Sequence, residues 1–258
     1  MIYITGDTHA DFSRINKNTI PDWNQMTHDD YLIICGDFGG IWEMKSNITD
    51  RERKNLHKIN SYPFTTLFVD GNHENFDRLN EYPVVDFCDG KAHKITDNIF
   101  HLMRGEYYTI DGHTFWVFGG ARSHDISDGI LDLDTIPKDK ILDTVMEWQY
   151  TKRFYRIKGL SWWEQEMPTK EEMVYGKDNL LKHGNKVDYI ITHDAPVYVA
   201  SKMVYGDFKS DELSEFLEDI SAETTFKKWF FGHYHKNMEF LTTDNKLYHC
   251  LYEDVIKL

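Results

Sequence analysis

Five short apolar segments, each closed by a polar loop, limit the fold of this chain more than any other feature. They are rich in β-branched and aromatic residues, and they read IYITGD (2–7), YLIICGD (31–37), TTLFVDGNH (65–73), DYIITHD (188–194) and KWFFGHYH (228–235). Segments of this length and composition are typical of β-strands. Because they are apolar throughout rather than alternating, we expect strands that are buried on both faces.

Helical patterns lie between these segments. Thr49 with Glu52, and again Thr169 with Glu172, have the spacing of a capping box at the start of a helix. Apolar residues at i, i+3, i+4 and i+7 mark residues 213–220 as a third helix. Strands and helices therefore alternate, which indicates an α/β protein with covered sheets. In such folds ligands bind at the carboxyl ends of the strands.

The stretch from about residue 104 to 186 departs from this alternation. It contains FWVFGGARSHDISDG (115–129) and GLSWWEQEMPTKEEM (159–173), separated by a charged and aromatic middle part. One interpretation is extra strands with a cap-like segment, within about 122–186, over the strand-end edge. The other is a longer β-rich half with a peripheral helix. Since no repeat, low-complexity tract or linker is found, we predict a single domain over 1–258.

Charge and hydropathy count against several classes of partner. The formal net charge is −14, whereas a broad nucleic-acid interface needs a basic face, so duplex nucleic acid is disfavoured as a partner. No apolar run approaches the ~20 residues of a membrane span, and no basic leader opens the sequence. The three cysteines, Cys35, Cys88 and Cys250, are scattered, as expected of thiols in a reducing compartment. We therefore expect a cytoplasmic protein without a membrane partner.

The polar residues that close the apolar segments suggest metal chemistry. They are Asp7, His9, Asp37, Asn72, His73, His193, His233 and His235. Carboxylates, an amide oxygen and imidazoles are the ligands that Mn, Fe, Co, Ni and Zn prefer. No cysteine is among them, so a structural zinc site is not indicated. The set is too large for one ion with an open position, but two ions that share a carboxylate would account for it.

The motifs GDTH, GD, GNHE, TH and GHYH, in this order, resemble the five blocks of the calcineurin-like metallophosphoesterases. The resemblance runs from Asp7 to His235. It implies a two-sheet β-sandwich flanked by helices, with two divalent metal ions at the carboxyl ends of the strands. It assigns Asp7, His9 and His235 to the first ion, Asn72, His193 and His233 to the second, and Asp37 to both. We expect Mn²⁺, with Fe, Zn, Ni or Co as alternatives.

The resemblance gives His73 a separate role as the catalytic residue. A hydroxide that bridges the two metals would attack phosphorus, and His73 would assist the leaving oxygen. The alternative is that His73 only orients Asn72.

The sequence also departs from the protein serine/threonine phosphatases of this superfamily. In GDFGGIWE, Gly40 and Ile41 stand where those enzymes have a carboxylate and a phosphate-binding arginine, and Asp70 stands where they have another arginine. Glu74 does match them. Isoleucine cannot supply a bidentate phosphate contact, so a protein phosphatase is disfavoured.

Other residues must then bind the substrate. The candidates are Arg122, His124 and Arg104, and the alternative for each is turn chemistry or solvated charge.

We predict a dinuclear metal-dependent phosphoesterase that hydrolyses a small phosphomonoester or phosphodiester, as a phosphatase or a phosphodiesterase. A metal-dependent nuclease acting on single-stranded nucleic acid is one alternative, although the acidic charge counts against it. A non-catalytic scaffold on the same fold is another. Scaffolds of this kind lose metal ligands or the catalytic histidine, whereas this chain keeps them. The sequence does not identify a protein partner.

Overall fold

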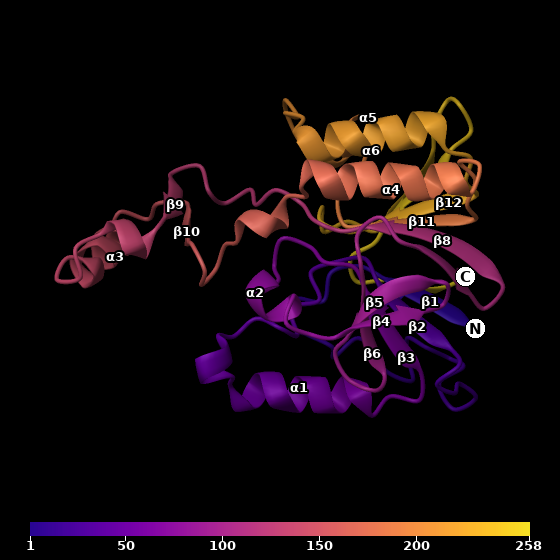
Figure 1. Cartoon of the computed structure of the whole chain (residues 1–258), viewed down its shortest axis with the longest axis horizontal. Coiled ribbons are helices and arrows are strands. Elements are labelled where there is room, and N and C mark those ends of the chain that lie inside the picture. The colour runs from indigo at the N-terminus through magenta and orange to yellow at the C-terminus, as the bar shows by residue number, and fades with distance from the viewer.

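The computed structural model describes residues 1–258, which form two large β-sheets with helices on both outer sides and one small two-stranded sheet (Figure 1). The first sheet has seven strands in the order β15–β1–β2–β3–β6–β5–β4. Their bounds are Val255–Lys257, Ile2–Thr5, Tyr31–Ile34, Thr65–Phe68, Ile99–Leu102, Gly90–Lys94 and Val84–Phe87. Strands β1, β2, β3 and β6 run parallel, so their carboxyl ends lie at the same edge.

The second sheet has six strands in the order β13–β14–β12–β11–β8–β7. Their bounds are Met238–Leu241, Leu247–Cys250, Lys228–Phe231, Tyr189–Thr192, His113–Phe118 and Tyr107–Ile110. The four inner strands β14, β12, β11 and β8 are parallel to one another. The chain is therefore a mixed α/β protein, as the sequence predicts.

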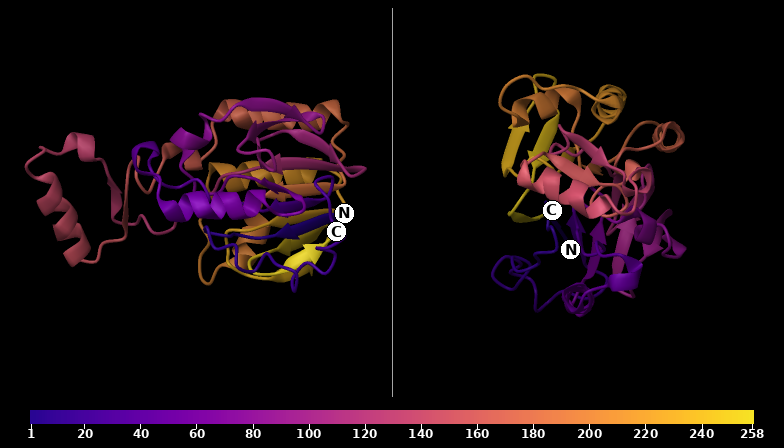
Figure 2. Two further views of the ribbon diagram at one scale, coloured as in Figure 1. Left: turned by 90° about the horizontal axis from the view of Figure 1, so that it is seen from below. Right: turned by 90° about the vertical axis from the view of Figure 1, so that its left-hand side faces the viewer.

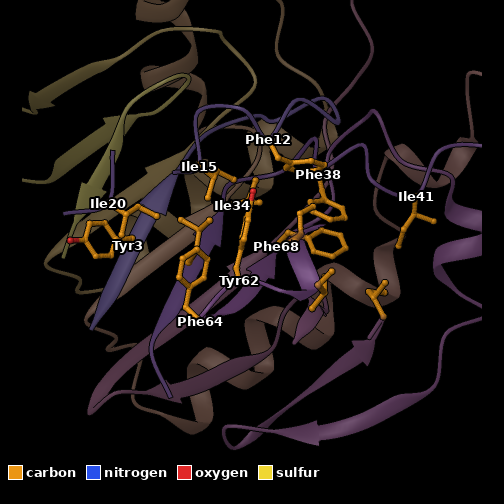
Figure 3. Packing of buried hydrophobic residues seen from close by; sticks show 14 of the residues in the cluster. Tyr3, Phe12, Ile15, Ile20, Ile34, Phe38, Ile41, Tyr62, Phe64 and Phe68 are labelled. Carbon is orange, nitrogen blue, oxygen red and sulfur yellow. The ribbon is translucent and has the colours of Figure 1, made fainter. Parts of the chain in front are cut away.

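Successive residues of the central strands point into different apolar clusters, which explains why these segments are apolar throughout. Ile2 and Ile4 share a buried cluster with Phe230 of the other sheet, so this cluster fills the space between the sheets. Tyr3, which lies between them in sequence, belongs to a cluster on the outer face of the first sheet (Figure 3). In that outer cluster the rings of Phe38 and Phe68 stack with centroids 4.3 Å apart. Strands buried on both faces are thereby confirmed.

The helices cover the two outer faces (Figure 1). Their bounds are Asp50–Asn60 for α1, Phe76–Leu79 for α2, Lys170–Lys182 for α4, Val197–Met203 for α5 and Glu212–Glu223 for α6. Helix α1 packs on the first sheet through Ile59, and α4 and α6 pack on the second through Leu180 and Leu213. None of the helices combines the length and apolarity needed to cross a bilayer.

One of the two predicted capping boxes is present. Thr169 and Glu172 bond each other's backbone N–H groups at the start of α4. Thr49 caps α1 by accepting from the backbone N–H of Glu52. The carboxylate of Glu52, however, accepts from the backbone N–H groups of Trp42 and Glu43 and pairs with Arg78. The prediction of a reciprocal box at α1 is therefore wrong, because a buried arginine and two backbone donors compete for this carboxylate.

Residues 125–162, called the arm below, project away from the two sheets (Figures 1 and 2). The arm contains β9 (Gly129–Leu131), α3 (Ile141–Tyr150) and β10 (Tyr155–Ile157), and β9 and β10 form a small parallel sheet. The predicted segment at 122–186 thus divides into two parts, since α4 packs on the second sheet instead. The arm leaves the body shortly after the carboxyl end of β8, on the edge where the polar loops gather.

Candidate metal centre

The loops after five parallel strands bring the predicted polar residues together. Asp7 and His9 follow β1, Asp37 follows β2, Asn72 and His73 follow β3, His193 follows β11, and His233 and His235 follow β12. The first three strands belong to one sheet and the last two to the other. The centre therefore lies where the edges of both sheets meet, which is the location predicted from the sequence.

Asp7, His9 and His235 form a compact group. Nε2 of His9 lies 3.0 Å from Nε2 of His235, which in turn lies 3.2 Å from Oδ2 of Asp7. One candidate ligand atom from each residue lies within 4.8 Å of the others. Two facing imidazole nitrogens cannot both carry a proton, so at least one lone pair points into the space they share with the carboxylate. This arrangement fits a cation.

Asp37 lies between this group and His193. Its Oδ1 is 3.3 Å from Nε2 of His193, and its Oδ2 is 3.7 Å from Nδ1 of His9. The ligand atoms of Asp7, Asp37 and His193 also lie within 4.8 Å of one another. The two oxygens of a single buried carboxylate thus face two different sets of candidate ligands.

Two buried polar atoms beside Asp37 have no hydrogen-bond partner: Nε2 of His193 and Oδ1 of Asn72. Nδ1 of His193 lies 2.8 Å from the backbone carbonyl of Cys35 and donates to it, so Nε2 is the ring nitrogen left for another partner. Although this Nε2 is 3.3 Å from Asp37, the two atoms lack the alignment of a hydrogen bond. Buried polar atoms are rarely left unpaired, and a bound ion would satisfy both of these.

The amide of Asn72 is held from behind. Its Nδ2 donates to Oγ of Ser123 at 3.3 Å, and Ser123 in turn donates to Oε2 of Glu166 at 2.6 Å. These two hydrogen bonds fix the orientation of the amide, because its nitrogen is engaged and its oxygen remains free to bind an ion.

His233 lies at the side of the centre. Its ring centroid is 5.0 Å from that of His193 and 4.5 Å from that of His124. Its backbone N–H donates to Oδ1 of Asp7 at 3.0 Å. His233 therefore sits next to His193, with which the resemblance pairs it, but outside the closest groups of ligand atoms.

Several residues of these loops have a strained backbone. Positive φ angles occur at His9 (44°), Asp37 (46°), His233 (66°) and His235 (50°), a region that non-glycine residues rarely adopt. The loops also approach one another closely. A Cβ on Gly71 would lie 2.1 Å from Oδ1 of Asp37, and a Cβ on Gly232 would lie 2.1 Å from Oδ1 of Asp7.

The buried charges affect one another strongly. Burial acts to lower the pKa of His193, but Asp37 and Asp7 outweigh it and raise this pKa to about 10. Burial opposes ionisation of Asp37, yet the positive charge of the neighbouring His193 keeps the pKa of Asp37 well below its usual value. Without an ion, a proton on His193 balances the buried carboxylates. A divalent cation would supply that balance directly.

Comparison with known proteins identifies the family of this centre. The sequence model of the calcineurin-like phosphoesterase family matches residues 1–237. This chain belongs to the calcineurin-like phosphoesterases. The family expected from the five motifs is thereby confirmed, and with it a metal-dependent hydrolase of phosphoesters in general terms.

Two solved structures resemble this phosphoesterase distantly. Phosphopantetheinyl hydrolase (PptH) from Mycobacterium tuberculosis is 14% identical, with 97% of this chain and 89% of that chain covered and a TM-score of 0.44. A candidate 5′-nucleotidase from Staphylococcus aureus, in complex with alpha-ketoglutarate, is 14% identical, with 98% and 48% covered and a TM-score of 0.45. The phosphoesterase thus spans about half the length of the second protein. Comparison with curated proteins gave no match.

The catalytic histidine predicted for this phosphoesterase has an unexpected neighbour. Nη2 of Arg156, from the arm, lies 3.0 Å from Nε2 of His73. The backbone N–H of His73 donates to Oδ1 of Asp37 at 2.8 Å, which ties its loop to the metal centre. Burial lowers the pKa of His73 to about 4, and the charge of Arg156 acts in the same direction while Asp37 opposes it. The imidazole is therefore neutral at neutral pH.

The three predicted substrate-binding residues of the phosphoesterase lie in different settings. Arg104 is buried, and its Nε donates to Oδ2 of Asp70 at 2.9 Å. Arg122 pairs with Asp211 at 3.3 Å, and its side chain is 53% exposed. Only His124 lies against the centre, through its ring contact with His233. The structure therefore favours a structural role for Arg104, because its guanidinium is already held by a buried carboxylate.

A cleft of about 220 Å³ opens beside the centre, and His9 and His73 line it together with Gly40, Trp42 and Arg51. Ile41 is fully buried in the outer core of the first sheet and cannot reach the cleft. Glu74 is also fully buried and accepts from the backbone N–H of Phe38 at 2.7 Å, so it holds the Asp37 loop.

No sequence pattern marks Arg156, Ser123 or Glu166 as part of the site. Arg156 reaches His73 across 83 positions of sequence, and Ser123 reaches Asn72 across 51. Their only signal was their place in the 104–186 stretch, which breaks the alternation of strands and helices.

Proposed function

We propose that this calcineurin-like phosphoesterase uses two divalent ions to hydrolyse a small phosphomonoester or phosphodiester. One ion would be held by Asp7, His9 and His235, the other by Asn72, His193 and His233, and Asp37 would contact both. The observation that carries this proposal is the placement of Asp37, whose two oxygens face His193 and His9 at 3.3 and 3.7 Å. A single buried carboxylate with ligands on both sides is suited to two ions.

When bound, the ions supply positive charge for the phosphoryl oxygens and a water that ionises near neutral pH. The protein's own residues supply the rest. Asp7 and Asp37 are buried, so their charges act at low dielectric. We assign His73 to the leaving oxygen, because it lines the same cleft as His9 with the two ring centroids 4.9 Å apart. A substrate phosphoryl group beside His9 would then present its ester oxygen to His73.

The cleft supports a small substrate. Its volume of about 220 Å³ accommodates a phosphoryl group and a modest leaving group. The indole of Trp42 faces this space, with its ring centroid 5.8 Å from that of His73. Position 41, where protein phosphatases have a phosphate-binding arginine, is a buried isoleucine, so the second motif has no arginine that could bind a phosphoprotein. We therefore infer weak activity on phosphoserine and phosphothreonine proteins.

We infer Mn²⁺ or a similar transition ion as the metal, since four of the seven assigned ligands are imidazoles. Magnesium prefers oxygen ligands and retains its waters, so it should support less activity.

A screen of metals against substrates tests these inferences. Protein stripped of metal would be given Mn²⁺, Zn²⁺, Ni²⁺ or Mg²⁺ with mono- and bis-nitrophenyl phosphate, nucleotides, phosphopeptides and single-stranded DNA. We expect turnover of a small ester with Mn²⁺, together with a Mn²⁺-dependent rise in melting temperature, because ions that bind only the folded state stabilise it. A melting shift without turnover of any ester would favour a non-catalytic scaffold. Fastest turnover of single-stranded DNA would favour a nuclease.

A further inference from the structure

We propose that Arg156 of the arm binds the substrate's phosphoryl group, in place of the arginine that the second motif lacks. The proposal rests on the phosphoesterase function given above and adds a residue to it. In the structure, Arg156 contacts His73. On substrate binding, one of its N–H groups turns to a phosphoryl oxygen instead.

The position of the guanidinium supports this assignment. Arg156 is the middle residue of β10, and its side chain is only 9% exposed. Its Nε donates to Oδ1 of Asp125 at 2.7 Å, and its Nη1 donates to the backbone carbonyl of Ser161 at 3.4 Å. Both partners belong to the arm, so the arm orients the guanidinium, and Nη2 is the group that extends to His73.

The contact with His73 leaves the cation with unused binding capacity. A guanidinium has five N–H donors and no acceptor, so Nε2 of His73 accepts, and the proton of the neutral ring lies on Nδ1. Three donors of Arg156 are engaged, and only one of their partners, Asp125, is charged. A phosphoryl oxygen is a stronger acceptor for a guanidinium than a neutral imidazole. Exchange of one for the other would also free Nε2 of His73 to take up a proton from solvent and donate it to the leaving oxygen.

Most other arginines near the centre already have strong partners. Arg14 donates to the backbone carbonyls of Gly6 and Asp7, Arg78 pairs with Glu52, and Arg104 pairs with Asp70. Arg51 lines the cleft, but it is an exposed residue at the start of α1. Arg156 is the arginine that contacts the histidine assigned to the reaction.

The base of the arm is fixed to the centre, which gives Arg156 a defined position. The backbone N–H and the hydroxyl of Ser123 donate to the carboxylate of Glu166, at 2.9 and 2.6 Å. These bonds join the two segments that flank the arm. Nε1 of Trp163 donates to Oδ2 of Asp77 in α2 at 2.9 Å. The projecting part is therefore anchored close to the point where Arg156 contacts His73.

Arg156→Ala, Arg156→Lys and the control Arg153→Ala test the proposal. Arg153 lies three positions earlier on the arm and stacks on Trp148, 4.7 Å from the ring centroid, so its loss removes a cation of the arm without touching His73. For each Mn²⁺-loaded protein, metal content, kcat, KM and the affinity for inorganic phosphate by calorimetry would be measured.

We expect Arg156→Ala to weaken phosphate binding and raise KM by about 10- to 100-fold, the usual value of a charge-assisted contact, at unchanged metal content. Arg156→Lys should recover part of the loss because it keeps the charge without the planar fork, and Arg153→Ala should match the wild type. If Arg156→Ala lowers kcat and leaves phosphate affinity and KM unchanged, the residue only positions His73, and the proposal is wrong. If the wild type hydrolyses no ester, the proposed function fails, and the phosphate affinities still decide the role of Arg156.

Discussion

The imidazoles of His9 and His235 meet through their Nε2 atoms at 3.0 Å, although 226 positions separate them in the sequence. Both nitrogens also lie within 4 Å of Oδ2 of Asp7, at 3.9 and 3.2 Å. Protons alone cannot pair all of the lone pairs that these two imidazoles and the carboxylate direct at one another. They make His235 the most direct test of the first ion.

His235→Ala should reduce the number of Mn²⁺ ions bound per chain from two to about one, because it removes a ligand of one ion and leaves Asn72 and His193 in place. Equilibrium dialysis with elemental analysis measures this number. His57→Ala, which removes an exposed imidazole of α1, is the control and should bind as the wild type does. A mutant that still binds two ions with unchanged affinity would contradict the assignment of His235.

Asp37→Asn should weaken the binding of both ions, since one carboxylate is assigned to both. The expected loss is at least ~10–100-fold for each ion, the effect of disturbing even a residue that orients a ligand. Asparagine tolerates the positive φ of 46° at this position and still accepts the N–H of His73, so the fold should survive. Calorimetric titration with Mn²⁺ would measure both affinities. A loss of affinity for only one ion would argue against a bridging role.

His73→Asn should lower kcat by ~10²–10⁴, the usual contribution of a positioned acid, and leave the metal content intact. The loss should be smaller for nitrophenyl phosphate than for an alkyl phosphate, because nitrophenolate departs with little protonation. Steady-state rates for both esters, with metal analysis of the same samples, test this.

Equal losses for the two esters would instead assign His73 to the phosphoryl oxygens or to orientation of Asn72. Loss of one ion in the mutant would make His73 a metal ligand. That outcome has a structural basis, since a nitrogen of His73 lies within 4.8 Å of ligand atoms of His9 and Asp37.

Arg104→Met should lower the free energy of unfolding by ~3–5 kcal/mol, the usual cost of removing one member of a buried ion pair. The side chains of Arg104 and Asp70 are only 6% and 2% exposed, so water cannot replace the lost partner. Arg122→Met is the control, because its pair with Asp211 is half exposed and should contribute less than about 1 kcal/mol. Urea unfolding measures both. A normal unfolding curve with a raised KM for Arg104→Met would restore Arg104 as a substrate-binding residue.

The sequence was sufficient to predict which loops meet, because the carboxyl ends of parallel strands share an edge whatever the details of the loops. Asp7, Asp37 and His193 each follow a strand that could be recognised from its composition, so their convergence needed no further information. The burial of the strands on both faces was predictable because these segments are apolar throughout rather than alternating.

The setting of single arginines was not predictable. Whether Arg104 lies in a cleft or in a buried pair depends on Asp70, which is 34 positions away. Arg156 enters the site from β10, a strand of three residues that has no recognisable pattern and whose path depends on the whole arm. Glu52 failed as a capping residue because Arg78, brought close only by the fold, takes its carboxylate. Each of these outcomes is a competition between partners from distant segments.

The close approach at Gly71 and Gly232 gives this enzyme two positions that perform no chemistry and yet admit no side chain. In each case an added methyl group would lie 2.1 Å from a carboxylate oxygen of Asp37 or Asp7, which is too close for non-bonded atoms. A substitution at either glycine would therefore displace one of these carboxylates. A survey of which positions tolerate substitution would therefore place these two glycines among the catalytic residues, although they take no part in the chemistry.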